Sequence, residues 1–209
     1  MTSFFSSGPK FDQTKFKVLL QLSQGRINLQ KTKAIQIAQQ HKREIADLLR
    51  DGKEDKARVR AMAVIMEDYT AEVLNQLGVY VHLLHSRYEL LLSQKTCPAD
   101  LKEACCAIVF AAPYLADQVE LLKCRSMLMA RFGKGFPDSC METNSVSPKI
   151  VSRLQPKSPD STLVNYYLTS IAREHEIAGW EPPTLPLPTL PSTGPRTDAS
   201  KCVAYGPGL

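Results

Sequence analysis

Two histidines and a glutamate in this sequence have a spacing that could bind a metal ion. His82, His85 and Glu89 stand at positions i, i+3 and i+7, so a helix would turn all three toward one metal ion. No second cluster supplies further ligands, and a polar flank beside an apolar stripe explains the same spacing. We therefore expect no metal here.

Motifs for catalysis are missing from the sequence. No serine or cysteine is arranged locally with a base that could activate it. The run Gly133-Lys134-Gly135 lacks the spacing of a phosphate-binding loop and suits a helix end instead. The cysteines form no C-x-x-C pair, which favours free, reduced thiols over a disulfide framework or a zinc site; they are Cys97, Cys105, Cys106, Cys124, Cys140 and Cys202. We predict a protein with no enzymatic activity and no cofactor.

Positive charge is concentrated at the front of the chain. Residues 1–60 contain 13 Lys or Arg and 6 Asp or Glu, whereas the remainder contains 13 and 15, and the net charge is +5. Such a front half suggests an anionic partner. A membrane surface is favoured over nucleic acid, because no aromatic residues interleave with the basic ones to stack on bases. The predicted membrane-binding residues are Lys10, Lys15, Lys17, Arg26, Lys31, Lys33 and Lys42.

A proline-rich segment near the C-terminus could bind a protein partner. Leu187, Pro188, Leu190 and Pro191 alternate apolar side chains with prolines. Proline restricts the unbound chain, so an extended peptide of this kind loses little entropy when it docks in a groove. A spacer with no partner would have the same composition.

A long helix must position the basic residues. Residues 11–50 contain no proline and only one glycine, Gly25. Apolar side chains recur on one helical face at Phe16, Leu20, Ile27, Ala34, Ile37 and Ile45. We expect Lys17, Lys31 and Lys42 about opposite this stripe. We expect Lys15, Arg26 and Lys33 along one flank.

A second long helix should follow the turn signal Asp51-Gly52. Its apolar stripe is Val59, Met62, Met66, Tyr69, Val73, Leu77, Tyr80, Leu84 and Leu91. This pattern predicts a helix of roughly 40 residues, about 60 Å long. Two long helices joined by so short a turn must run antiparallel, as a hairpin.

Three shorter helices are expected to pack on the hairpin, which makes the fold all-α. The first should begin at Cys97-Pro98 and the second at Pro113, because proline suits the first helical turn. Residues 136–158 read as a long connector. The last helix should follow Ser158-Pro159 and end near residue 179.

Several separated blocks, in the same order, resemble the increased-sodium-tolerance family of ESCRT-III-like regulators of vacuolar protein sorting. They are residues 42–49 (KREIADLL), 51–53 (DGK), 57–60 (ARVR), 67–69 (EDY), 97–98 (CP), 100–104 (DLKEA), 110–113 (FAAP), 132–136 (FGKGF) and 171–175 (IAREH). The resemblance covers about residues 10–182. It implies an ESCRT-III-like helical domain over residues 11–178, between a flexible N-terminus at 1–10 and a disordered Pro-rich tail at 179–209.

The resemblance also implies a function. Family members bind ESCRT-III subunits, the AAA ATPase that disassembles them, and membranes, which they can coat as filaments, so a homo- or hetero-polymer is expected. The tail residues Leu187, Pro188, Leu190 and Pro191 are similar to the proline-containing MIT-interacting motif, which docks onto MIT domains. The implied protein is a non-enzymatic regulator of endosomal and vacuolar protein sorting. The alternative is a soluble helical adaptor that does not bind membranes.

The sequence also suggests where the protein acts. No apolar run is long enough to span a bilayer, and the N-terminus lacks the pattern of a secretion signal. We therefore expect a cytoplasmic protein held peripherally on endosomal membranes.

Overall fold

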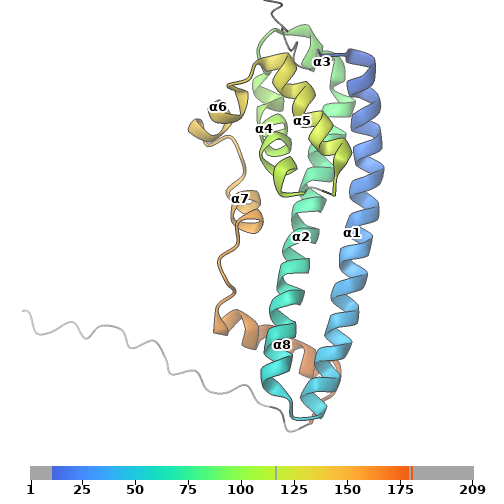
Figure 1. Cartoon of the computed structure of the whole chain (residues 1–209), viewed down its shortest axis with the longest axis vertical. Coiled ribbons are helices and arrows are strands. Elements are labelled where there is room, and N and C mark those ends of the chain that lie inside the picture. Colours follow the sequence, from blue (N-terminus) through green and yellow to red (C-terminus); the bar gives the residue numbers. More distant parts are fainter. Residues whose placement is uncertain (1–10, 116, 179, 181–209) are drawn as a thin grey trace, which may run out of the picture.

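The computed structural model describes residues 11–115, 117–178 and 180, and within these ranges every regular element is a helix. The all-α prediction is confirmed. The elements are α1 (Gln13–Arg50), α2 (Glu54–Ser86), α3 (Tyr88–Ser93), α4 (Ala99–Ala111), the 3-10 turn η1 (Ala112–Tyr114), α5 (Val119–Phe132), α6 (Phe136–Glu142), α7 (Pro148–Leu154) and α8 (Ser161–Glu174) (Figure 1). No described helix combines the length and the hydropathy needed to traverse a bilayer.

The long helices α1 and α2 form the antiparallel hairpin that the sequence predicts (Figure 1). At the start of α1, the Asp12 carboxylate caps the helix by accepting a hydrogen bond from the Lys15 amide at 3.0 Å. At the turn, Gly52 adopts a φ of +70°, which costs a glycine little. The Lys53 amide then donates to the Leu48 carbonyl at 2.8 Å, so the end of α1 is satisfied within the turn itself.

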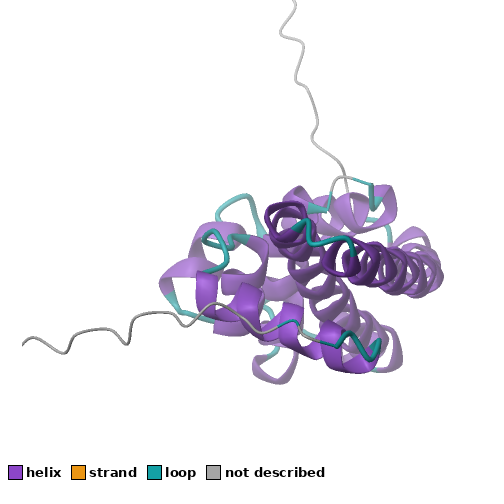
Figure 2. Cartoon of the chain, turned by 90° about the horizontal axis from the view of Figure 1, so that it is seen from below, coloured by secondary structure: helices purple, strands orange, loops and turns teal. Residues whose placement is uncertain are grey.

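Most of the apolar core lies at the end of the hairpin away from its turn. There α4 packs on α2, and α5 packs on both α1 and α4 (Figures 1 and 2). Phe16, Leu84, Leu91, Leu101 and Ile108 are fully buried in this core. Burial of such side chains is worth about 1.5–3 kcal/mol each, so this end of the molecule supplies most of the hydrophobic stabilisation.

A second, smaller core lies at the turn end, where α8 folds back across α1 and α2 (Figure 1). Ala57 and Ala61 of α2 are buried here, and their small side chains bring α8 close to the hairpin. Leu168 and Ile171 of α8 fill this core. The Asp160 carboxylate caps α8 by accepting from the Leu163 amide at 2.7 Å.

The boundaries of two expected helices need correction. The second long helix was expected to run unbroken for about 40 residues, but α2 ends at Ser86 and the chain restarts as α3 at Tyr88, with Arg87 between them in a non-helical conformation. The helix expected to start at Pro113 starts at Val119 instead, because Pro113 lies in the 3-10 turn η1.

The segment expected to be a long connector contains two short helices, α6 and α7. Each has a proline in its first turn, where proline is tolerated because that amide needs no helical partner. Each also buries an apolar side chain against the main core, Phe136 from α6 and Ile150 from α7. Local composition indicated a loop, and tertiary contacts stabilise helices there instead. The last helix, α8, ends at Glu174, earlier than expected.

The prediction of free cysteines was wrong for one pair. Cys106 of α4 and Cys140 of α6 form a disulfide, with their Cα atoms 5.3 Å apart. Both are buried, and they are 34 residues apart in the sequence, so spacing alone did not pair them. Cys97, Cys105 and Cys124 remain free thiols.

Candidate functional site

Three of the predicted membrane-binding lysines lie beside the core rather than opposite it. The Lys17 ammonium lies 5.6 Å from the centre of the Tyr88 ring. The Lys31 ammonium donates to the Asn75 side chain of α2 at 3.3 Å. Lys42 is half-buried. The expectation that these lysines project away from the apolar stripe is therefore corrected, since at 100° per residue they lie within about 90° of it.

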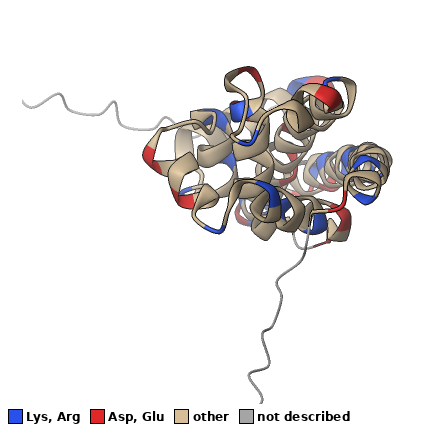
Figure 3. Cartoon of the chain, turned by 90° about the horizontal axis from the view of Figure 1, so that it is seen from above, with Lys and Arg blue, Asp and Glu red and all other residues tan. Residues whose placement is uncertain are grey.

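The flank that carries Lys15, Arg26 and Lys33 lies where the sequence places it. All three residues are exposed. The Arg26 side chain lies 3.8 Å from the half-buried Glu120 carboxylate of α5, and the Arg26 side chain itself is 46% exposed, so solvent still reaches it. Figure 3, which looks down the long axis of the molecule, shows Lys and Arg on the outer surface of the helices. Lys10 lies outside the described residues.

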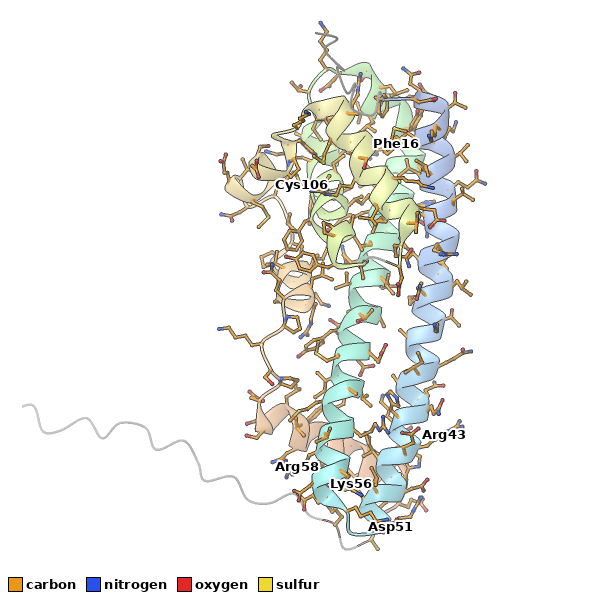
Figure 4. The ribbon with its side chains drawn as sticks, viewed as in Figure 1. Phe16, Arg43, Asp51, Lys56, Arg58 and Cys106 are labelled. Carbon is orange, nitrogen blue, oxygen red and sulfur yellow. A yellow bond between two sulfur atoms is a disulfide. The ribbon has the colours of Figure 1, made fainter. Side chains whose placement is uncertain are left out.

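A second group of charges surrounds the turn of the hairpin, where Figure 4 labels Arg43, Asp51, Lys56 and Arg58. The Arg60 guanidinium joins the two long helices through Glu44 at 3.0 Å. Among the described residues, Arg43 and Lys56 take part in no ion pair, so both remain available to an anionic partner.

Arg58 fixes α8 to the hairpin. One guanidinium nitrogen donates to the Asn165 side chain of α8 at 2.8 Å, and two others contact the Glu54 carboxylate at 3.0 and 2.8 Å. Asn165 is almost fully buried, so this hydrogen bond satisfies a polar group that water cannot reach.

The apolar stripe of α2 is covered along only part of its length. From Val73 to Leu84 its residues are buried, because α4 packs on them. Val59, Met62 and Met66 continue the same stripe toward the turn but are 69%, 38% and 38% exposed. The periodicity predicts that these three residues are buried with the rest of the stripe, and this is wrong, because periodicity identifies a stripe and does not tell which part of it a neighbour covers.

A shallow apolar groove borders the exposed part of this stripe. It has a volume of about 590 Å³ and lies between α1 and α2, lined by Leu48, Asp55, Lys56, Val59, Arg60 and Ala63. Its floor is apolar and its rim is charged, which is the composition of a surface that holds an amphipathic helix. The exposed residues Val59, Met62 and Met66, together with this groove, are called the α2 docking face below.

The α7–α8 arm crosses α2 beside the α2 docking face. The Arg153 guanidinium of α7 stacks 3.9 Å from the centre of the Tyr69 ring and contacts the Glu72 carboxylate at 3.1 Å. The Tyr167 hydroxyl of α8 donates to Asp68 at 2.9 Å. Burial, reinforced by this hydrogen bond, raises the pKa of Tyr167 well above its ordinary value, so its proton stays in place at neutral pH.

The two histidines and the tail motif singled out in the sequence remain to be placed. His82 is exposed and His85 is half-buried. Within residues 11–115, 117–178 and 180, no three His, Cys, Asp or Glu side chains converge as a metal ion would require. Leu187, Pro188, Leu190 and Pro191 lie outside the described residues, so the tail motif remains a prediction.

A protein-family model and two curated proteins match most of this chain. The family model described as "Regulator of Vps4 activity in the MVB pathway" matches residues 17–178. An IST1-like protein of Dictyostelium discoideum is 32% identical over 175 residues, which are 83% of this chain and 47% of that protein. The vacuolar protein sorting-associated protein IST1 of Saccharomyces cerevisiae is 26% identical over 172 residues, which are 78% of this chain and 58% of that protein. The chain thus spans about half the length of these relatives.

A solved structure agrees with the sequence relatives. The S. cerevisiae Ist1 N-terminal domain, solved in complex with the Did2 MIM motif, superposes with a TM-score of 0.72 at 25% identity. The match covers 80% of this chain and 94% of that one. The long hairpin, its shorter helices and the family match over residues 17–178 lead to one conclusion: the chain belongs to the Ist1 family.

Proposed function

We propose that the protein is a non-enzymatic regulator of endosomal and vacuolar sorting that binds ESCRT-III subunits, anionic membrane and the disassembly AAA ATPase. The observation that carries the proposal is the family match over residues 17–178, on a hairpin that leaves an apolar docking face uncovered. The protein would act at the cytoplasmic surface of endosomes, alone or in a polymer with other ESCRT-III-like subunits.

The α2 docking face would hold a helical segment of an ESCRT-III subunit. Val59, Met62 and Met66 would receive the apolar side of that helix, and Lys56 would attract acidic residues on its rim. Methionine suits such a surface because its flexible side chain adapts to different partners. The yeast relative, solved with a MIM motif bound, supports a peptide-binding role for this domain.

The exposed cations of α1 would hold the protein at an anionic membrane. Lys15, Arg26 and Lys33 lie on one flank of the helix. Each cation close to an anionic bilayer contributes roughly 1 kcal/mol, and salt weakens the attraction. Arg43, exposed on α1 near the turn, adds a further cation.

The proline-rich tail would recruit the ATPase. Leu187 and Leu190 would fill pockets of an MIT domain, and Pro188 and Pro191 would keep the segment extended. One short motif gives modest affinity, so recruitment would depend on the high local concentration that a membrane-bound assembly provides.

A pull-down with separate baits tests the two protein-binding sites. The full chain and a chain lacking residues 180–209 are each offered the MIT domain of the ATPase and the C-terminal segment of an ESCRT-III subunit. The truncated chain should lose the MIT domain and keep the ESCRT-III segment. Retention of the MIT domain by the truncated chain would refute the role of the tail.

Point substitutions locate the ESCRT-III site. The double variant Met62→Asp, Met66→Asp should lose the ESCRT-III segment. Val79→Asp is the matched control, because Val79 is 57% exposed on the same helix but lies outside the α2 docking face. Equal binding by both variants would show that the segment docks elsewhere.

One observation favours the alternative of a soluble adaptor. Lys17 and Lys31 contact Tyr88 and Asn75 within the protein, which leaves fewer cations for a membrane than the sequence suggests. An adaptor of this kind would bind the ESCRT-III segment normally and would ignore anionic vesicles at physiological salt.

A further inference from the structure

The outer side of α1 carries an apolar ridge that no part of the described structure covers. Val18, Leu22 and Leu29 are 49%, 54% and 66% exposed. With Gly25 between them they are spaced by four, three and four residues, so they lie in one line along the helix. The line extends about 17 Å at 1.5 Å per residue. These three side chains, on the side of α1 away from α2, are called the α1 ridge.

The α1 ridge is convex, which limits what can bind it. Helix α1 forms one long edge of the molecule in Figure 1, and the view along the long axis in Figure 2 places it at the periphery. Leucine and valine protruding from a convex edge offer no walls to hold a peptide. A fluid surface can adapt to such an edge along its whole length, so the shape fits a lipid bilayer.

The positive charge beside the α1 ridge favours a bilayer with anionic headgroups. Lys15, Arg26 and Lys33 follow one side of it, within about 60° of Leu22 and Leu29 on the helix. Residues 13–43 contain no Asp or Glu, so nothing on this helix repels an anionic headgroup over that length. A second copy of the chain packed on the same ridge would bring these like charges together, which disfavours a self-contact.

We propose that the α1 ridge inserts into the boundary between headgroups and acyl chains of an anionic bilayer, with Lys15, Arg26 and Lys33 on the lipid phosphates. The inference rests on the membrane binding proposed above and adds an apolar, salt-resistant component to it. The helix is already formed and held by α2 and α5, so insertion does not require a disordered segment to fold.

Co-sedimentation with vesicles tests the insertion. The probe is a vesicle of phosphatidylcholine with about one-third phosphatidylserine, in low and in high salt. The double variant Leu22→Gln, Leu29→Gln should bind these vesicles roughly tenfold more weakly than the wild type. It should also lose the binding that the wild type retains in high salt. The matched control is Ile35→Gln, because Ile35 is 44% exposed on α1 but lies away from the ridge.

A second measurement places the side chains in the lipid directly. A Val18→Trp variant should be quenched by lipids brominated on their acyl chains, and an Ile35→Trp variant should not. The wild type, whose single tryptophan is Trp180, gives the background. Because the substituted positions are exposed, circular dichroism should show every variant folded as the wild type is.

The outcomes separate this inference from the proposed function. Unchanged vesicle binding by the Leu22, Leu29 double variant would overturn ridge insertion and leave electrostatic membrane binding intact. Failure of the wild type to bind any anionic vesicle would overturn both. If the double variant instead loses self-association in sedimentation velocity and keeps its vesicle binding, the ridge is an interface between copies and the proposal is wrong.

Discussion

At the scale of single residues, Arg58 of α2 connects the hairpin to α8. It lies near the start of α2, contacts Glu54 one helical turn away, and donates to the buried Asn165 of α8 at 2.8 Å. An arginine can do this because its planar guanidinium presents several donors in fixed directions. The attachment of α8 to the hairpin therefore depends on one side chain more than on the exposed ion pairs around the turn.

We expect Arg58→Ala to lower the free energy of unfolding by about 1–3 kcal/mol, because it leaves a buried amide without its partner. Chemical denaturation of the purified variant measures the change. Lys53→Ala is the control, since Lys53 forms only an exposed pair with Asp51 and should cost less than about 1 kcal/mol. A larger loss for Lys53→Ala than for Arg58→Ala would contradict the role given to Arg58.

Because Cys124 is buried, we expect the free energy of unfolding to fall as the pH rises into the alkaline range. Burial in α5 raises the pKa of its thiol to about 11, from an ordinary value near 9. The unfolded chain therefore loses this proton first as the pH rises, and the folded state loses stability above pH 9. Between pH 8 and pH 10 the loss from this one thiol is about 1.4 kcal/mol.

The comparison that isolates Cys124 is the change in unfolding free energy between pH 8 and pH 10, for the wild type and for Cys124→Ala. The variant loses a packed side chain and is less stable at both pH values, but its pH-dependent loss should be smaller than that of the wild type. Equal losses in the two proteins would mean that Cys124 is not shielded from water as the structure indicates.

The spacing of apolar residues predicts burial correctly where another helix packs on the stripe and incorrectly where none does. Phe16, Leu20 and Ile27 are buried as expected, because α2 lies along the whole of α1. Val59 and Met62 were expected in the core and are exposed, because the helix that covers this stripe does not extend that far. The periodicity of the sequence predicts which face of a helix a side chain lies on. Whether another helix packs on that face depends on the tertiary fold.

At the scale of elements, the hairpin was predictable and the short helices were not. The turn at Asp51-Gly52 and two long periodic runs are local signals, and the hairpin follows from them. Helices α6 and α7 have only seven residues each, too few to be stable alone, so their local sequence gives a weak signal. Their stability comes from burial against the core and, for α6, from a disulfide to α4.

The disulfide between Cys106 and Cys140 should contribute to stability and hold α6 in place. In the loop-entropy model, closing a loop of 34 residues lowers the conformational entropy of the unfolded chain and so raises its free energy by roughly 4 kcal/mol. We expect a reductant to lower the unfolding free energy of the wild type by up to that amount. Cleavage near α6 by a protease should become faster.

Cys140→Ser is the control for this prediction, since it removes the bond in advance. Its stability and its cleavage pattern should not respond to the reductant. A response of the variant equal to that of the wild type would trace the effect to another group. A wild type that does not respond would mean that the bond does not form in solution.

At the scale of the whole molecule, the proposed membrane surface and the proposed ESCRT-III site are centred on different helices of the hairpin. Helix α1 presents cations and the α1 ridge on its outer side, and α2 presents its docking face near the turn. The proposed ATPase motif at Leu187 and Leu190 follows the α7–α8 arm in the sequence. In the proposed function the membrane and the ATPase bind different segments of the chain, so one protein molecule could bring the enzyme to a membrane-bound assembly.

The most direct test of this account is co-sedimentation of the ATPase MIT domain with anionic vesicles, in the presence and absence of the protein. The wild type should carry the MIT domain to the vesicles. The variant Leu187→Asp, Leu190→Asp should reach the vesicles to the same extent and leave the MIT domain in solution. Recruitment of the MIT domain by this variant as efficiently as by the wild type would contradict the account.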